Sequence, residues 1–161
     1  MINELRNISE LSGEILMNHF RNLSDDSVIE KDKHDFVTKV DKESELLITS
    51  LLIENFPSIP VFGEEFEWSN TSTKNDIYWV IDPLDGTKNY IQGLPYFCIS
   101  IALIKNNKPI VGVIFDPLHK EFYYAEKNKG AYLNDNKIIV SERTNLDHGF
   151  ISTGFPFRNR K

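Results

Sequence analysis

Three apolar runs between residues 77 and 117 constrain the fold more than any other feature of the chain. They read IYWVI (77–81), FCISIALI (97–104) and PIVGVIFDP (109–117). Each run is short and rich in β-branched residues, which is typical of strands. The polar connector KNNK between the last two runs predicts a β-hairpin. This part of the chain is therefore expected to form a sheet.

Further strand-like segments lie on both sides of these runs. IPVFGEE (59–65) indicates a short buried strand that ends at Gly63. EFYYAEKNKGAYLNDNKIIV (121–140) indicates two or three strands, with turns at Gly130 and at the polar NDN. GFISTGFPF (149–157) indicates the start of another strand.

Two helices are expected before the sheet. The first is predicted over about 3–22, because apolar residues recur there at spacings of three and four. They are Ile2, Leu5, Ile8, Leu11, Ile15, Leu16, Phe20 and Leu23. Residues 24–34 are polar and are expected to form a loop.

The second helix is expected after a short strand at 36–40. Asp41 is its expected N-cap, and the helix ends before Pro57. Its expected apolar stripe comprises Leu46, Leu47, Leu51, Leu52 and Phe56. Helices followed by strands predict an α+β fold, a layered sandwich in which two N-terminal helices pack on a mostly antiparallel sheet.

Composition excludes several classes of protein. The formal net charge is −6 and no basic face is predicted, which argues against nucleic acid as the main partner. The single cysteine, Cys98, excludes an internal disulfide and favours a reducing compartment. Residues 1–20 lack the apolar core of a signal peptide, and no run reaches the ~18 apolar residues of a membrane span. A cytoplasmic protein with no membrane partner is expected.

Carboxylates gather at the ends of the predicted elements. The three pairs are Asp35 and Asp41, Glu64 and Glu65, and Asp82 and Asp85. If the strands before Glu64 and Asp82 are neighbours, Glu64, Asp82 and Asp85 converge at one edge of the sheet. Converging carboxylates repel one another unless a cation compensates. Oxygen ligands of this kind suit Mg²⁺.

A glycine and a hydroxyl follow these carboxylates in DPLDGT (82–87). Gly86 has no Cβ, so a phosphate can approach the backbone closely. A helix that starts near Thr87 would direct backbone N–H groups at an anion. The Thr87 hydroxyl could hold a water. Together these features predict a metal and phosphate site.

Each feature also has an ordinary structural explanation. DPLDG alone could be a turn, Glu64 and Glu65 a solvated pair, and Asp41 only a helix cap. Two other motifs fit poorly. The D-x-D-G-T motif of haloacid dehalogenase-type phosphatases has one residue between its aspartates, whereas two stand here. The EF-hand spacing is absent. The combination of three acidic pairs favours a site.

The sequence resembles the inositol monophosphatase family of metal-dependent, lithium-sensitive phosphatases. The matching segments are DFVTKVD (35–41), GEE (63–65), WVIDPLDGTKNYIQGLPYFCISIAL (79–103), GVIFDPLHKEFYYAEKNKGAYLND (112–135) and STGFPF (152–157). They cover nearly the whole chain in the family's order, and GEE combined with DPLDGT is highly specific.

The resemblance implies roles for eight residues. Glu64, Asp82 and the Leu84 carbonyl would hold a first Mg²⁺, Asp82 and Asp85 a second, with two or three ions in all. The residues implied to bind substrate are Glu64, Leu84, Asp85, Gly86 and Thr87. The residues implied to act in catalysis are Asp41, Glu64, Glu65 and Thr87. Asp41 would bond Thr87 and, with the two glutamates, orient the metal-activated water that attacks phosphorus. A homodimer is also implied.

One family segment is not matched. Members of the family carry a W-D-x-A-A-G-like motif late in the chain, and its aspartate completes the second metal site. Residues 1–143 are interpreted as an N-terminal metal- and phosphate-binding domain, and 144–161 as the start of a second domain. A fragment, a naturally short product, or a chain completed by a partner would each fit, and the fragment is favoured.

The expected function is Mg²⁺-dependent hydrolysis of inositol 1-phosphate or a similar small polyol phosphate. Two alternatives stay open at this point. One is a non-catalytic, shortened relative that acts as a binding or regulatory module. The other is a phosphatase of a nucleotide, adenosine 3′,5′-bisphosphate, or of fructose 1,6-bisphosphate.

Overall fold

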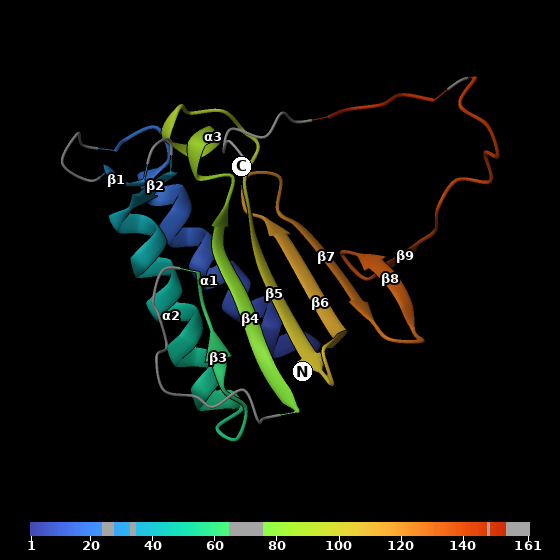
Figure 1. The fold of residues 1–161 in the computed structure, drawn as a ribbon, viewed down its shortest axis with the longest axis horizontal. Coiled ribbons are helices and arrows are strands. Elements are labelled where there is room, and N and C mark those ends of the chain that lie inside the picture. Colours follow the sequence, from blue (N-terminus) through green and yellow to red (C-terminus); the bar gives the residue numbers. More distant parts are fainter. Residues whose placement is uncertain (24–27, 33–34, 65–75, 148, 154–161) are drawn as a thin grey trace.

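The structure is a computed structural model, and it describes residues 1–23, 28–32, 35–64, 76–147 and 149–153. Figure 1 shows the elements in chain order. They are α1 (Ile2–His19), β1 (Val28–Asp32), β2 (Asp35–Thr38), α2 (Lys39–Asn55), β3 (Val61–Phe62), β4 (Ile77–Asp85), α3 (Thr87–Ile91), β5 (Cys98–Lys105), β6 (Lys108–Asp116), β7 (Glu121–Glu126), β8 (Gly130–Leu133) and β9 (Asn136–Ile138).

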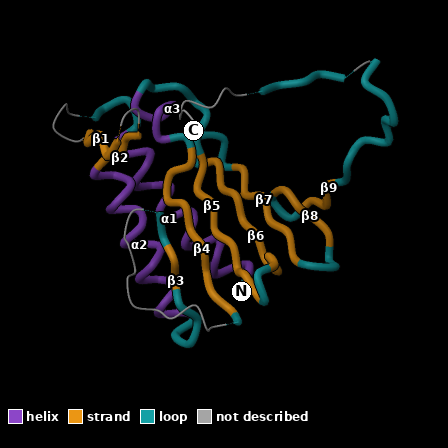
Figure 2. Tube along the Cα trace, in the orientation of Figure 1, coloured by secondary structure: helices purple, strands orange, loops and turns teal. Residues whose placement is uncertain are grey.

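Seven strands form one sheet in chain order, from β3 to β9. Only β3 and β4 pair in parallel, and every other neighbouring pair is antiparallel (Figure 2). Short turns explain this order, because antiparallel neighbours need only a hairpin connection. The predicted hairpin between β5 and β6 turns at Asn106 and Asn107, both of which have positive φ. The α+β fold with a mostly antiparallel sheet is therefore confirmed.

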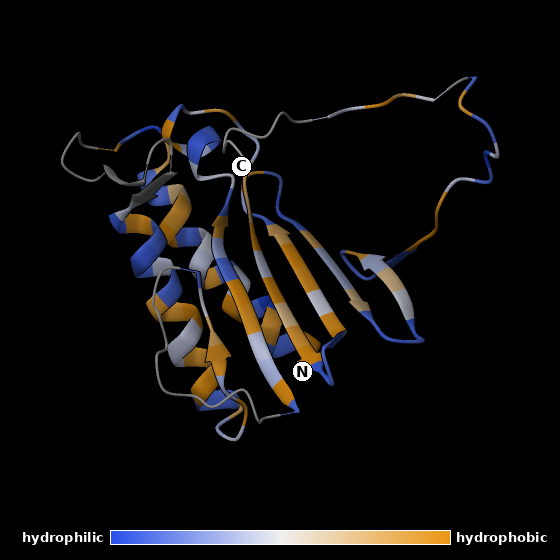
Figure 3. Ribbon diagram, in the orientation of Figure 1, coloured by the Kyte–Doolittle hydropathy of each residue, from blue (hydrophilic) through white to orange (hydrophobic). Residues whose placement is uncertain are grey.

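Helices α1 and α2 cover one face of the sheet (Figure 1). Alternate residues of the central strands point toward them, because side chains along a strand alternate between its two faces. On β5 the buried residues are Ile99, Ile101 and Leu103, and on β6 they are Val111, Val113 and Phe115. Apolar stretches therefore run along these strands beside the helices (Figure 3). Trp79 on β4 is fully buried in the same core.

The other face of the sheet is less covered. Val80 on β4 is 41% exposed and Ile114 on β6 is 48% exposed. Beyond β9 the chain leaves the sheet, and Val140 and Phe150 are almost fully exposed there (Figure 1). Within the described ranges, no helix combines the length and apolar character needed to cross a membrane.

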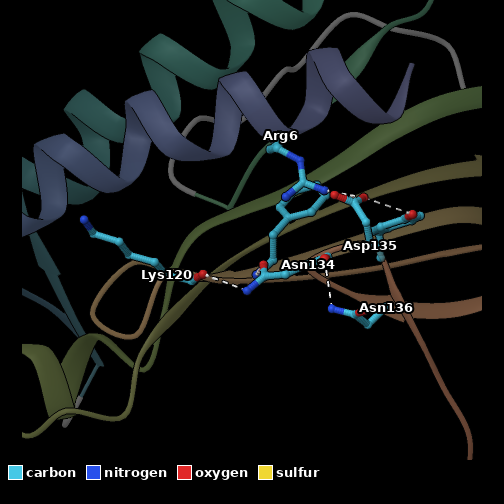
Figure 4. A network of polar contacts seen from close by, with 7 residues as sticks. Arg6, Lys120, Asn134, Asp135 and Asn136 are labelled. Atoms are coloured by element: carbon cyan, nitrogen blue, oxygen red, sulfur yellow. Dashed lines mark hydrogen bonds and ion pairs between the residues drawn. The ribbon is translucent and has the colours of Figure 1, made fainter.

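A surface cluster holds the first turns of α1 to the far edge of the sheet (Figure 4). The Arg6 guanidinium donates to Asp135 Oδ1 at 2.6 Å and lies 4.4 Å from the centre of the Phe122 ring. Tyr124 donates its hydroxyl to the same Asp135 oxygen at 3.3 Å. Asn134 accepts from the Phe122 backbone N–H at 2.9 Å. This cluster attaches the β8–β9 turn to the N-terminal helix.

Several expectations about local structure were wrong. The polar stretch expected to be a loop contains β1, whose residues pair antiparallel with β2. Helix α1 ends at His19, before the expected boundary. Residues 149–153 form no strand, and the rest of the strand expected at 149–157 lies outside the described residues. The loop prediction for 24–34 failed because it relied on polarity. The segment VIEKD of β1 is mostly polar, yet it can pair with a neighbouring strand.

The buried face of α2 also differs from the expected stripe. Leu46 is 54% exposed, whereas Asp41, Ser44, Glu45 and Thr49 are buried. Similarly, Leu11 on α1 is 37% exposed, while Ser9 and Ser12 are buried. Periodicity of apolar residues could not identify these faces, because polar side chains occupy part of each.

Candidate functional site

Strands β3 and β4 bring three carboxylates to one edge of the sheet. The parallel register pairs Val61 with Trp79 and Phe62 with Val80. Glu64 follows β3 by two residues and Asp82 follows Val80 by two, so both lie at the same end of the strand pair. Burial, followed by the charges of Glu64 and Asp85, raises the pKa of Asp82 to about 7. Glu64 and Asp85 therefore lie near enough to Asp82 to affect its pKa, while a metal site built from all three carboxylates stays a prediction.

The donors have the chemistry of a hard-cation site. All are oxygens, and their mutual repulsion is the kind that a bound divalent cation relieves. Within the part of the chain that the structure describes, however, no group of three or more His, Cys, Asp or Glu side chains is close enough to hold a metal ion. Glu65, which was expected to contribute, lies outside the described residues. The donor types fit Mg²⁺, but the described residues do not by themselves form a metal site.

Strand β4 is irregular where the carboxylates lie. Asp82 pairs with Ser100 and Asp85 with Cys98, and the register shifts between these pairs. The Leu84 N–H donates to Asp82 Oδ1 at 3.1 Å. The Thr87 Oγ1 lies 3.0 Å from the Leu84 carbonyl oxygen, to which it donates. Hydrogen bonds between the side chains of Asp82 and Thr87 and the backbone of Leu84 therefore stabilise the conformation of the DPLDGT segment.

Gly86 is required by the backbone at the end of β4. Its φ is +93°, in the region that favours glycine. A Cβ at this position would lie 2.6 Å from the Tyr96 carbonyl oxygen. Helix α3 begins at the next residue, Thr87, as expected. It is anchored by Tyr90, which is fully buried and donates its hydroxyl to the Leu16 carbonyl at 2.6 Å.

Asp41 connects the start of α2 to this segment, although it is not the N-cap that was expected. Thr38 is the N-cap, and its hydroxyl accepts from the backbone N–H of Val40 and of Asp41. Asp41 is the third helical residue and completes a capping box, because its Oδ2 accepts from the Thr38 N–H at 2.9 Å and from the Thr38 hydroxyl. Its Oδ1 lies 3.2 Å from Thr87 Oγ1 and so shares the single hydroxyl hydrogen of Thr87 with the Leu84 carbonyl. The Thr-x-x-Asp spacing was the signal that could have identified Thr38.

Asp41 is a buried carboxyl with several donors around it. It is 1% exposed, and burial raises its pKa. Hydrogen bonds from Thr38 and Thr87 act in the opposite direction, because they stabilise the charged form. Asp41 therefore acts as an acceptor that fixes the position of the Thr87 hydroxyl.

Cys98 lies beside the site but has the character of a packed thiol. Its Sγ is 4.0 Å from Asp85 Oδ2. Burial, followed by the charge of Asp85, raises the pKa of Cys98 to about 12. A thiol in that range is a poor nucleophile near neutral pH.

Comparison with known proteins identifies the family of the chain. The sequence profile of the inositol monophosphatase family matches residues 2–161. The chain is 38% identical over 159 residues to the "Nus factor SuhB" of Xylella fastidiosa, covering 99% of this chain and 57% of that protein. It is also 38% identical over 159 residues to the "Fructose-1,6-bisphosphatase/inositol-1-monophosphatase" of Aquifex aeolicus, covering 98% of this chain and 60% of that protein.

A solved structure shares the fold. The structure of a Thermotoga maritima IMPase superposes with a TM-score of 0.76 at 35% identity, covering 85% of this chain and 52% of that one. The chain therefore spans little more than half the length of the proteins that it matches. Because the profile matches almost every residue, the chain belongs to the inositol monophosphatase family.

Proposed function

We propose that this chain carries metal- and phosphate-binding residues of a divalent-cation-dependent phosphomonoesterase. The proposed substrate is inositol 1-phosphate or a similar small polyol phosphate. The observation that carries the proposal is the parallel register of β3 and β4, which places Glu64 level with Asp82, shortly before Asp85, Gly86 and Thr87. Membership of a family that includes phosphatases supports the same reaction class.

Mg²⁺ is the proposed cation. Glu64, Asp82 and the Leu84 carbonyl would hold one ion, and Asp82 and Asp85 would contribute to a second. When bound, such ions neutralise charge on the phosphate and lower the pKa of a coordinated water. Of the three carboxylates, Asp82 is half-buried, whereas Glu64 and Asp85 are exposed, so an uncompensated charge is costly mainly at Asp82.

The other residues position the substrate and the water. Gly86 would present its backbone to the phosphate, and its missing Cβ lets the chain pass close to the Tyr96 carbonyl. Asp41 holds the Thr87 hydroxyl, which would then orient the water, together with the carboxylates of Glu64 and Glu65. Asp85, Gly86 and Thr87 would contact the phosphate. Helix α3 has only five residues, so its dipole adds little to phosphate binding.

The chain spans little more than half the length of its relatives, and this affects the activity that we expect. We propose residues 1–143 as a metal- and phosphate-binding domain and 144–161 as part of a second. The second ion is proposed to need a further carboxylate that these residues do not supply. The 161-residue chain alone is therefore expected to bind divalent cations and to show little or no turnover of inositol 1-phosphate.

The test is the substitution Asp82→Asn. It is made both in the 161-residue chain and in a longer protein that has the full length of its relatives. In the chain, calorimetric titration with Mg²⁺ is expected to show weaker binding by at least ~10-fold, because a charged ligand is lost. In the longer protein, Mg²⁺-dependent phosphate release from inositol 1-phosphate is expected to be abolished. Asp76→Asn is the matched control, since Asp76 is an exposed aspartate beside the opposite end of β4. Unchanged turnover in Asp82→Asn would refute the proposal.

A second candidate is a binding or regulatory module without catalysis. It is favoured by the SuhB relative, which is named as a Nus factor rather than as an enzyme. Absence of Mg²⁺-dependent phosphate release from a natural protein whose intact mass is 18.6 kDa would support this candidate. Rapid turnover would exclude it.

If the protein is a phosphatase, which phosphate ester it hydrolyses is a separate question. The Aquifex aeolicus relative carries both activities in its name, which keeps fructose 1,6-bisphosphate open beside inositol 1-phosphate. Parallel assays of these two esters and adenosine 3′,5′-bisphosphate at one Mg²⁺ concentration would rank them by kcat/KM.

A further inference from the structure

Two buried serines connect the N-terminal helices to the irregular part of β4. Ser12 on α1 and Ser44 on α2 are both fully buried, and their Oγ atoms are 2.6 Å apart. Ser44 Oγ also lies 3.3 Å from the Pro83 carbonyl oxygen. A chain of two hydroxyls therefore runs from α1 through α2 to the backbone between Asp82 and Asp85.

The number of hydroxyl hydrogens determines which serine donates in each of these two hydrogen bonds. A carbonyl oxygen can only accept, so the one hydroxyl hydrogen of Ser44 is directed at Pro83. Ser12 must then donate to Ser44. A hydroxyl that accepts one hydrogen bond is polarised and becomes a better donor in the next. Ser12 therefore strengthens the bond from Ser44 to Pro83.

The Pro83 carbonyl needs a partner of this kind. Pro83 and Leu84 fall within the register shift between Asp82 and Asp85, where neither has a paired residue on β5. Proline has no N–H, and the Leu84 N–H and carbonyl bond to Asp82 and Thr87, respectively. The Ser44 hydroxyl completes this set, so every backbone polar group of Pro83 and Leu84 is bound by a side chain.

Other buried hydroxyls on the same helices do not take part. Ser9 on α1 is fully buried and Thr49 on α2 is 4% exposed. Neither Ser9 Oγ nor Thr49 Oγ1 has a hydrogen-bond partner among the described residues. Burial of a hydroxyl is therefore not in itself the feature that distinguishes Ser12 and Ser44. The distinguishing feature is the contact with the backbone at Pro83.

We propose that the Ser12–Ser44 hydroxyl chain is a positioning element for the cation site, because it holds the peptide between Pro83 and Leu84. That peptide sets the orientation of the Asp82 carboxylate, which accepts from the Leu84 N–H, and of the Leu84 carbonyl. The inference rests on the proposed function for the cation, but the positioning itself is independent of any bound ion. Ser12 and Ser44 are positioning residues and do not touch the substrate.

The first readout uses the metal-free 161-residue chain. Amide hydrogen exchange of Leu84 is measured by NMR in the wild type, in Ser44→Ala and in Ser12→Ala. Ser44→Ala is expected to speed exchange of Leu84 by roughly threefold to tenfold, as for the loss of one buried hydrogen bond. A smaller acceleration is expected for Ser12→Ala. The amide of Leu103 on β5 is the internal reference, and its exchange is expected to stay the same.

The second readout is cation affinity, with Mn²⁺ as the probe and free Mn²⁺ followed by electron paramagnetic resonance. Ser44→Ala is expected to weaken Mn²⁺ binding by roughly threefold to tenfold. Ser9→Ala and Thr49→Val are the matched controls, since each removes a buried hydroxyl from the same helices. They are expected to leave both readouts at wild-type values, even where the thermal midpoint falls as far as in Ser44→Ala.

The outcomes separate this inference from the proposed function. Faster Leu84 exchange together with weaker Mn²⁺ binding, in Ser44→Ala but not in the controls, supports it. Unchanged Leu84 exchange, unchanged Mn²⁺ affinity, or equal changes in the controls would overturn it. If the wild-type chain does not bind Mn²⁺, the role of Ser12 and Ser44 in positioning a cation site is overturned, and the result counts against the proposed function. Leu84 exchange would still decide whether the two serines hold the peptide between Pro83 and Leu84.

Discussion

Two polar networks connect the N-terminal helices to the sheet, and they differ in burial. One joins Asp41, Thr38 and Thr87 beside the candidate site, where Asp41 is 1% exposed. The other joins Arg6 to Asp135 at the opposite edge, where the Asp135 side chain is 68% exposed (Figure 4). Both networks link segments that are far apart in the sequence.

The difference shows where the chain depends on exact polar geometry. Buried hydrogen bonds are costly to leave unmade, because no water replaces the lost partner. An exposed ion pair exchanges readily with water and salt, so its net contribution is small. The buried network therefore determines the shape of the candidate site, whereas the exposed cluster mainly adds a contact between α1 and the β8–β9 turn.

The largest expected effect on the buried side is that of Gly86→Ala. The substitution forces a φ of +93° on alanine and places its Cβ 2.6 Å from the Tyr96 carbonyl oxygen. We expect the free energy of unfolding to fall by about 2–4 kcal/mol, as measured by urea denaturation. Gly112→Ala on β6 is the control, since a Cβ there meets nothing within 4 Å. Equal losses in the two variants would show that the end of β4 is no more constrained than a central strand.

Thr38→Ala tests the buried network directly. It removes the N-cap of α2 and the hydroxyl that donates to Asp41. We expect the free energy of unfolding to fall by about 1–2 kcal/mol in urea denaturation. Thr38→Ser keeps the hydroxyl and is expected to retain most of the stability. If Thr38→Ser were as unstable as Thr38→Ala, the loss would come from packing of the methyl group and not from capping.

Asp135→Asn tests the exposed cluster and is expected to have the smallest effect. It removes the charge that pairs with Arg6 at 2.6 Å. We expect the free energy of unfolding to change by less than about 1 kcal/mol, and the difference from wild type to shrink in 1 M NaCl. Thermal denaturation at low and high salt measures it. A salt-independent loss as large as that of Thr38→Ala would contradict the comparison between the two networks.

Much of the candidate site could be predicted from local sequence. The run DPLDGT indicated carboxylates at a strand end and, conditionally, a helix beginning near Thr87, and the structure has both, whereas the positive φ of Gly86 was not predicted. Such features depend on residues that are adjacent in the chain, so turn and strand preferences are enough to identify them. That β3 and β4 are neighbours was a conditional expectation and is the case, but their parallel direction was not predicted.

The parts that could not be predicted involve polar residues inside the helices. Asp41 was expected to be the N-cap, but that position belongs to Thr38. Ser12 and Ser44 gave no signal in the sequence, because apolar periodicity does not register a buried hydroxyl. Leu46 was expected in the apolar stripe and is exposed instead.

The sequence by itself determined most of the helices and strands, their order and the acidic strand ends of this family member, but not β1. Those properties arise from neighbouring residues, whose backbone preferences and alternation hold in any context. Only the tertiary structure decided which buried polar groups meet, such as Ser44 with Pro83 and Asp41 with Thr87. These contacts join residues 39 and 46 positions apart, so they depend on how α2 packs against β4 and α3, which no local pattern encodes.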